Sequence, residues 1–132
     1  MVVPAALREL VRTRAGERCE YCGIHQDDDS FFRFHIEHIV ARQHGGQTAE
    51  SNLALSCHHC NLHKGPNLSG IDPATDFTEP LFNPRVQTWE EHFTMDGATV
   101  TGATPTGRAT VRVLAMNARG RVDLRRLALR EL

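Results

Sequence analysis

Residues 19–60 read CEYCGIHQDDDSFFRFHIEHIVARQHGGQTAESNLALSCHHC, with a Cys-x-x-Cys pair at each end. A single pair of this kind would also fit a redox motif, but two pairs in one small chain are typical of a tetrahedral zinc site. Four thiolates leave no open position on the metal, so we expect the zinc to be structural and the chemistry to lie elsewhere. The predicted ligands are Cys19, Cys22, Cys57 and Cys60.

The two cysteine pairs enclose 34 residues, which is more than a simple zinc ribbon needs. Residues 31–40 are aromatic and β-branched and predict a strand pair or one long strand, and residues 53–57 predict a second short strand. Residues 58–64 predict a short helix that ends at Gly65-Pro66. On that helix, Asn61 falls on the same face as the zinc ligands, whereas His58, His59 and His63 point away from it.

Glu37 and His38 end the first predicted strand. A carboxylate offers a hard oxygen ligand to a divalent cation, and an imidazole titrates near neutrality. The plainer alternative for an isolated Glu-His pair is an exposed ion pair. His35 lies two residues back on the Glu37 side of the strand, so it is either a second cation ligand or only a neighbour.

The order of these motifs within residues 19–67 closely resembles the HNH endonuclease family. The resemblance implies an α+β fold with a small ββα-metal core stapled by the four-cysteine zinc site. The motifs that carry it are Cys19-x-x-Cys22, His35-Ile-Glu37-His38-Ile39-Val40, Gly45-Gly46, Asn52-Leu53 and Cys57-His-His-Cys60-Asn61-x-x-Lys64-Gly65.

Carried over by position, the resemblance implies that His38 is the general base and that Asn52 braces the loop between the strands. Glu37 and Asn61 would hold one divalent cation, which we expect to be Mg²⁺ or Mn²⁺ because few protein ligands surround it. The implied reaction is the hydrolysis of a phosphodiester bond to 5′-phosphate and 3′-hydroxyl ends. Glu37 stands where aspartate is commoner and Ala41 replaces a frequent proline, but neither change removes a functional group.

The distribution of charge along the chain indicates what kind of molecule the protein binds. The net charge is −1, yet residues 1–18 carry four arginines against two acids and residues 108–132 carry seven against two. Positive charge at both ends could flank a phosphate backbone, or it could be a solvated helix face. Arg42 and Lys64 are candidates for phosphate contacts. We expect a nucleic-acid partner, DNA rather than RNA.

The flanking residues predict a helix over residues 4–15, a hairpin over residues 93–104 and two short helices in the tail, broken near residues 117–120. We expect residues 1–132 to form a single domain, with a C-terminal extension at residues 68–132 packed on the nuclease core. No apolar run approaches the length of a membrane span and no signal peptide is recognisable, so we expect a cytoplasmic protein.

Two other functions remain open on the sequence. A non-catalytic zinc module that binds nucleic acid would explain the cysteines and the arginines, but not Glu37, His38 and Asn61 together. A structural or protein-interaction zinc domain would leave even the arginines unexplained.

Overall fold

The computed structural model describes residues 3–130, and the chain divides into two compact units, Met1–Pro66 and Asn67–Leu132. The boundary coincides with the end of the predicted nuclease core. That residues 68–132 pack on this core as one domain stays a prediction. Within the described part of the chain, no helix is long and apolar enough to cross a membrane.

The first unit begins with the predicted N-terminal helix, α1 (Ala5–Ala15). It ends at Gly16, whose φ of 63° lies in the left-handed region that glycine adopts without strain. Val11 is fully buried on its inner face. Arg12 on the same helix donates a hydrogen bond of 2.8 Å to the carbonyl oxygen of Phe34, which ties α1 to the segment that leads into the first strand.

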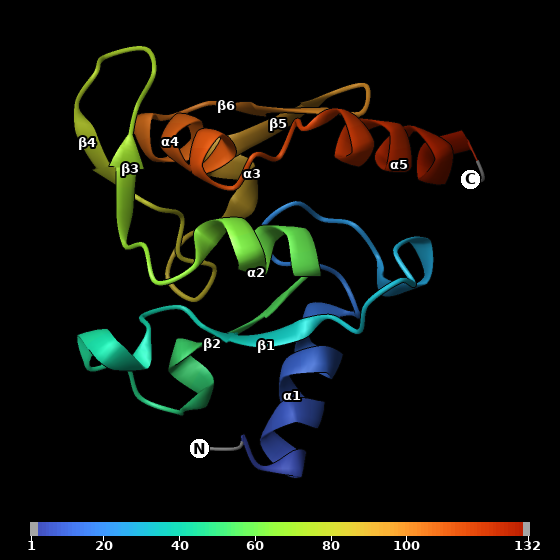
Figure 1. Ribbon diagram of the computed structural model, residues 1–132, viewed down its shortest axis with the longest axis vertical. Helices are drawn as coiled ribbons and strands as arrows, with labels where there is room; N and C mark the ends of the chain where they lie inside the picture. Colours follow the sequence, from blue (N-terminus) through green and yellow to red (C-terminus); the bar gives the residue numbers. More distant parts are fainter. Residues whose placement is uncertain (1–2, 131–132) are drawn as a thin grey trace. The chain divides into compact units, whose positions relative to one another are not determined.

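A two-stranded ribbon forms the centre of this unit (Figure 1). Strands β1 (His35–His38) and β2 (Leu53–Ser56) pair antiparallel, and the loop between them contains two short 3₁₀ helices, η2 (Arg42–His44) and η3 (Glu50–Asn52). The short helix α2 (His58–Lys64) follows β2 directly, as the sequence predicts. Helix α2 packs against β1 and α1 packs against β2, on opposite sides of the ribbon.

The predicted strand over residues 31–40 is too long. Only four of these residues form β1, and Phe31 and Phe32 lie in a bend that follows the 3₁₀ helix η1 (Gln26–Asp28). The Gln26 side chain holds this bend, because it accepts a hydrogen bond from the backbone amide of Phe34 and donates one to the carbonyl oxygen of Phe32. The aromatic composition that favoured a strand therefore belongs in part to a loop.

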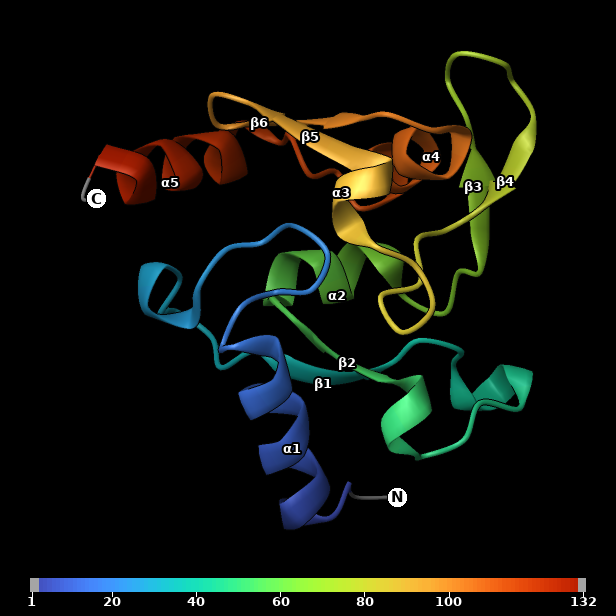
Figure 2. The same cartoon turned by 180° about the vertical axis from the view of Figure 1, so that it is seen from behind.

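The second unit contains a β-hairpin packed on a helix (Figure 2). The predicted hairpin is confirmed as β5 (Phe93–Asp96) and β6 (Thr99–Gly102), after the one-turn helix α3 (Trp89–His92). The two predicted tail helices are also confirmed. A further small hairpin was not predicted. The remaining elements are β3 (Ser69–Ile71), β4 (Thr78–Pro80), α4 (Pro105–Val113) and α5 (Arg119–Arg130).

Several arginines of the two basic ends hold the fold together. All four arginines of residues 1–18 donate hydrogen bonds to backbone carbonyls. In the second unit, Arg108 forms an ion pair of 2.8 Å with Asp72 and lowers the pKa of that carboxyl to about 2 by hydrogen bonding to it. Arg125 is buried and donates to the carbonyl oxygen of Ala98. Less of the clustered charge is therefore available to a phosphate backbone than the sequence suggests.

Candidate active site and metal centre

The four cysteines meet at one buried point of the first unit. Their sulfur atoms all lie within 4.8 Å of one another, and none is in a disulfide. Two backbone amides point at the sulfurs, from Cys22 to Cys19 at 3.5 Å and from Cys60 to Cys57 at 3.3 Å. Burial raises the pKa of the Cys19 thiol well above its usual value, whereas hydrogen bonds with the other three cysteines lower the pKa of Cys22. The cluster fits a structural zinc ion.

Glu37 is the buried carboxylate of β1. Its Oε1 accepts a hydrogen bond of 2.8 Å from the hydroxyl of Tyr21 and lies 3.1 Å from the ammonium nitrogen of Lys64. Its Oε2 is also buried but has no hydrogen-bond partner among the described residues. Burial raises the pKa of Glu37, and the charge of Lys64 partly offsets that shift. One oxygen is thus used by the protein and the other is available to a ligand.

The prediction that Lys64 contacts a phosphate is wrong. Its side chain is only 2 % exposed, and its Nζ donates a hydrogen bond of 2.9 Å to the carbonyl oxygen of Ile39 besides pairing with Glu37. A buried ammonium in two such contacts cannot reach a nucleic-acid backbone. Lys64 instead compensates the charge of Glu37 and fastens α2 to the end of β1.

His38 lies next to Glu37 at the end of β1 and is partly exposed. Its Nε2 is 2.9 Å from the hydroxyl oxygen of Thr48 in the loop between the strands. Desolvation and the nearby charge of Arg42 lower the pKa of His38 below the usual 6.5. The lowered pKa favours the neutral imidazole, the state that a general base requires. Arg42 itself is exposed at the start of η2, and its contact with phosphate stays a prediction.

Asn52 ties the two ends of the loop between the strands. Its side-chain oxygen accepts a hydrogen bond from the amide of Val40, and its side-chain nitrogen donates to the carbonyl oxygens of Val40 and Gln47. Gly46 makes a close approach possible, because a Cβ at this position would overlap the carbonyl oxygen of Val40. These contacts hold the segment that carries Thr48, the partner of His38.

Asn61 lies on α2 and is half-buried. It precedes Lys64 by three residues, so the two side chains share one face of the helix. Lys64 reaches Glu37 on β1. In the described chain, the side-chain amide of Asn61 forms no hydrogen bond, and that it shares a cation with Glu37 stays a prediction.

His35 is paired with His58, which the sequence had placed on the outward side of the helix. The Nε2 of His35 is 3.0 Å from the Nδ1 of His58, and desolvation and the nearby His58 lower the pKa of His35. Among residues 3–130, the cysteine cluster is the one group of three or more His, Cys, Asp or Glu side chains close enough to share a metal. His35 thus contacts a neighbour on α2 and does not complete a second such group.

Sequence reasoning missed three residues around the site: Tyr21, Thr48 and His58. Tyr21 occupies a variable position of the first cysteine pair and is fully buried, at 0 % exposure. The one signal that could have singled it out is that it is the only tyrosine of the chain. Thr48 and His58 contact His38 and His35 across the fold, so no local pattern marks them.

Replacing Lys64 with methionine should destabilise the first unit by about 3 kcal/mol at pH 7. The variant leaves the carboxylate of Glu37 buried without its countercharge, and protonating a carboxyl with an ordinary pKa of 4.5 at pH 7 costs about this much. The loss should shrink as the pH falls from 7 towards 5, since the protonated acid needs no countercharge. The free energy of unfolding in urea, with zinc release as the signal, measures this loss of stability.

The matched control is the double variant Glu37→Gln/Lys64→Met, which removes both charges and keeps an oxygen for the hydroxyl of Tyr21. It should be more stable than Lys64→Met alone at pH 7 and should lose the dependence on pH. A single variant as stable as the wild type at pH 7 would contradict the role given to the ion pair.

Two antiparallel strands followed by a short helix, with four clustered cysteines at its side, define a zinc-stapled ββα-metal fold. The family model of the HNH endonucleases matches residues 19–67, so this segment is similar to an HNH endonuclease domain. The family supports a nuclease-type function in general.

The chain is similar to the Septu protein PtuB of Bacillus thuringiensis. It is 30 % identical over 105 residues, which are 78 % of this chain and 38 % of that protein. The chain therefore spans well under half the length of the relative it matches. No solved structure matches the chain significantly.

Proposed function

We propose that the chain is a metal-dependent endonuclease that hydrolyses phosphodiester bonds in DNA. The observation that carries the proposal is the unpartnered, buried Oε2 of Glu37 directly before a half-exposed His38. Burying a carboxylate oxygen without a hydrogen-bond partner costs free energy unless a ligand contacts it. A carboxylate oxygen favours a divalent cation as that ligand.

Glu37 and Asn61 would hold that cation, Mg²⁺ or Mn²⁺, one oxygen from each side chain. When bound, it supplies charge that stabilises the phosphorane-like transition state and the departing oxygen. The charge of Lys64 favours the ionised form of Glu37, and Tyr21 fixes the orientation of the carboxyl group through its hydroxyl. Neither residue needs to touch the substrate.

His38 would take the proton from the attacking water. If its Nε2–H donates to the hydroxyl oxygen of Thr48, the lone pair of Nδ1 is left to receive that proton. Asn52 fixes the loop that carries Thr48, and so acts on the orientation of the imidazole as a positioning residue. Arg42, exposed close to His38, is suited to contact a phosphate of the substrate.

A supercoiled plasmid tests this function. After dialysis against buffer without divalent cations, the wild type should be inactive, and added Mg²⁺ or Mn²⁺ should restore nicking. Dialysis is preferred to EDTA because a chelator would also take the structural zinc. Glu37→Gln should not respond to the cation, and the nicked ends should carry 5′-phosphate and 3′-hydroxyl groups. RNA of the same sequence should be cut more slowly.

The alternative is a non-catalytic zinc module that binds nucleic acid, and the same experiment separates the two. Retention of the plasmid in a gel-shift assay, with no nicking at any cation concentration, would favour the module and contradict the endonuclease. Cleavage that is unchanged in Glu37→Gln would contradict the assignment of this carboxylate.

A further inference from the structure

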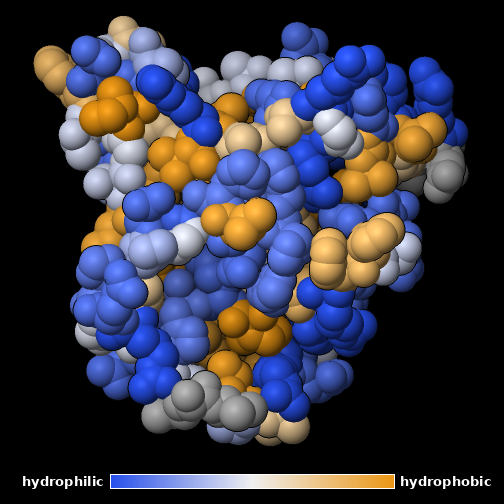
Figure 3. Space-filling model, in the orientation of Figure 1, coloured by the Kyte–Doolittle hydropathy of each residue, from blue (hydrophilic) through white to orange (hydrophobic). Residues whose placement is uncertain are grey.

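Two phenylalanines of the first unit are exposed beside a histidine. Phe31 is 88 % exposed and Phe32 is 49 % exposed. The ring of Phe32 stacks on that of His58 with centroids 4.1 Å apart and planes at 23°, and the ring of Phe31 follows at 5.4 Å from Phe32. We call these three residues the aromatic row. Figure 3 shows apolar atoms protruding among hydrophilic ones on the face where Figure 1 draws the segment after η1.

The exposure of the aromatic row does not come from a loose loop. The side-chain nitrogen of Gln26 donates to the carbonyl oxygens of Asp29 at 2.9 Å and Phe32 at 3.0 Å, while its oxygen accepts from the amide of Phe34 at 2.7 Å. One side chain therefore fixes three backbone groups of the bend. Rigid aromatic rings held in water are a feature of binding surfaces, because burying them costs little conformational entropy.

The aromatic row is connected to the candidate active site. His58 contacts His35, which precedes Glu37 by two residues on the same face of β1, a separation of about 7 Å. His58 also precedes Asn61 by three residues, or about 4.5 Å along α2. Bases stack about 3.4 Å apart along a strand. A nucleotide at the candidate cation site would therefore have its neighbours within reach of the aromatic row.

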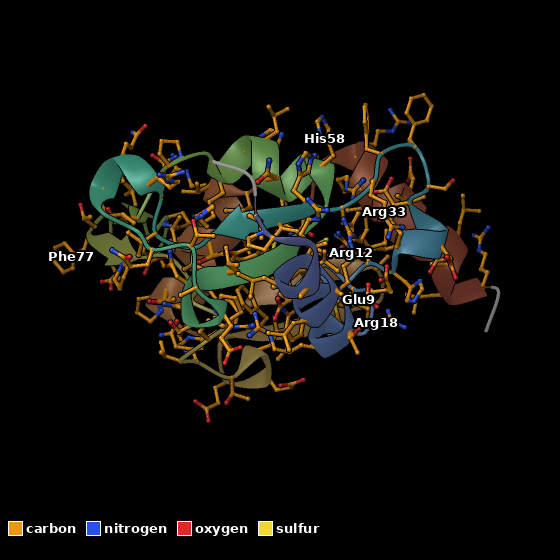
Figure 4. All side chains as sticks on the ribbon, turned by 90° about the horizontal axis from the view of Figure 1, so that it is seen from below. Glu9, Arg12, Arg18, Arg33, His58 and Phe77 are labelled. Atoms are coloured by element: carbon orange, nitrogen blue, oxygen red, sulfur yellow. The ribbon has the colours of Figure 1, made fainter. Side chains whose placement is uncertain are left out.

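Positive charge borders the aromatic row on one side. Arg33 follows it directly, is exposed, and forms no hydrogen bond or ion pair with any residue in the described range. The charges of Arg33 and Arg8 both act on Arg12, so the three guanidinium groups lie near one another. Figure 4 shows His58, Arg33 and Arg12 in succession from α2 to α1. Asp27, Asp28 and Asp29 precede the row, so its other side carries negative charge.

We propose that the aromatic row stacks on unpaired nucleobases while Arg33 attracts their phosphates, so that the preferred substrate has a single-stranded segment next to the scissile bond. This inference rests on the proposed endonuclease function. Aromatic rings beside a positively charged surface are the usual means of binding single strands, since every base has a face that can stack. A paired base inside a duplex offers no free face to such rings.

Fluorescence anisotropy with a labelled DNA single strand and its duplex tests the proposal, in buffer without added divalent cation. Phe31→Ala should weaken single-strand binding about 5- to 100-fold and duplex binding much less. Phe31→Trp should keep or improve single-strand binding. Phe31 is so exposed that its replacement leaves the fold intact. Phe77→Ala in the second unit, where the ring is 69 % exposed, is the matched control and should bind like the wild type.

Cleavage supplies the second measurement. The wild type should cut a duplex with a gap or an unpaired tail faster than a full duplex, and Phe31→Ala should lose that preference. A Phe31→Ala variant that binds and cuts single-stranded and duplex DNA as the wild type does would contradict the role proposed for the aromatic row. It would not contradict the proposed endonuclease function. A wild type that neither binds nor cuts any of these DNAs would overturn the endonuclease itself.

Discussion

Cys60→Ser is expected to abolish the folded state of the zinc-stapled unit, rather than merely slow a reaction. Structural zinc in small domains supplies about 10–16 kcal/mol of apparent binding free energy, which is as large as the whole stability of a typical domain. The four sulfurs are buried within 4.8 Å of one another, so a hydroxyl in place of one thiolate leaves three thiolates around a poorly held cation. Zinc content and far-UV circular dichroism measure the outcome.

His63→Gln is the control for this prediction. His63 is exposed on the same helix, three residues after Cys60, and its replacement should leave zinc content and helicity unchanged. A Cys60→Ser protein with one zinc per chain and the wild-type spectrum would show that the cysteine cluster does not support the fold.

The parts of the fold that could be predicted are those that local sequence determines. The spacing of the cysteine pairs predicted the zinc centre, and the end of α2 at Gly65-Pro66 followed from residues that stop helices. Gly16 marked the end of α1 for the same reason. Each of these signals acts within a few residues of the chain.

The parts that could not be predicted depend on contacts across the fold. Lys64 looked like an exposed lysine at the end of a helix, and only the packing of α2 on β1 places it against Glu37. Phe31 and Phe32 looked like strand residues, but the hydrogen bonds of Gln26 hold them in a bend. The β3–β4 hairpin was missed because its residues are rich in proline, glycine and aspartate, which favour loops.

At the candidate site, too, some features follow from local sequence and others depend on contacts across the fold. His38 and Glu37 were recognised by their order in a motif, which says nothing about what surrounds them. The structure adds an imidazole in contact with Thr48 and a carboxylate with one oxygen used by Tyr21 and Lys64. These surroundings leave Glu37 a single oxygen for the proposed cation, which a family motif alone could not indicate.

His38→Ala is expected to lower the rate of plasmid nicking by about 10²- to 10⁴-fold, the contribution of a well-placed general base. The variant should keep its zinc and its affinity for DNA, because His38 is partly exposed and contacts the loop only through Thr48. Since desolvation lowers the pKa of His38 below 6.5, wild-type activity should persist below pH 6.5 before the protonated imidazole stops it.

Two further variants test whether the loss of rate in His38→Ala comes from the loss of a general base. His44→Ala removes an exposed histidine from η2 in the same loop and should nick at the wild-type rate. Thr48→Val should reduce the rate less than His38→Ala does, because it disturbs the orientation of the imidazole but keeps the group that takes the proton. Equal loss in His44→Ala would point to a general effect on the loop. Wild-type nicking by His38→Ala would mean that another group activates the water, and the mechanism derived from β1 would be wrong.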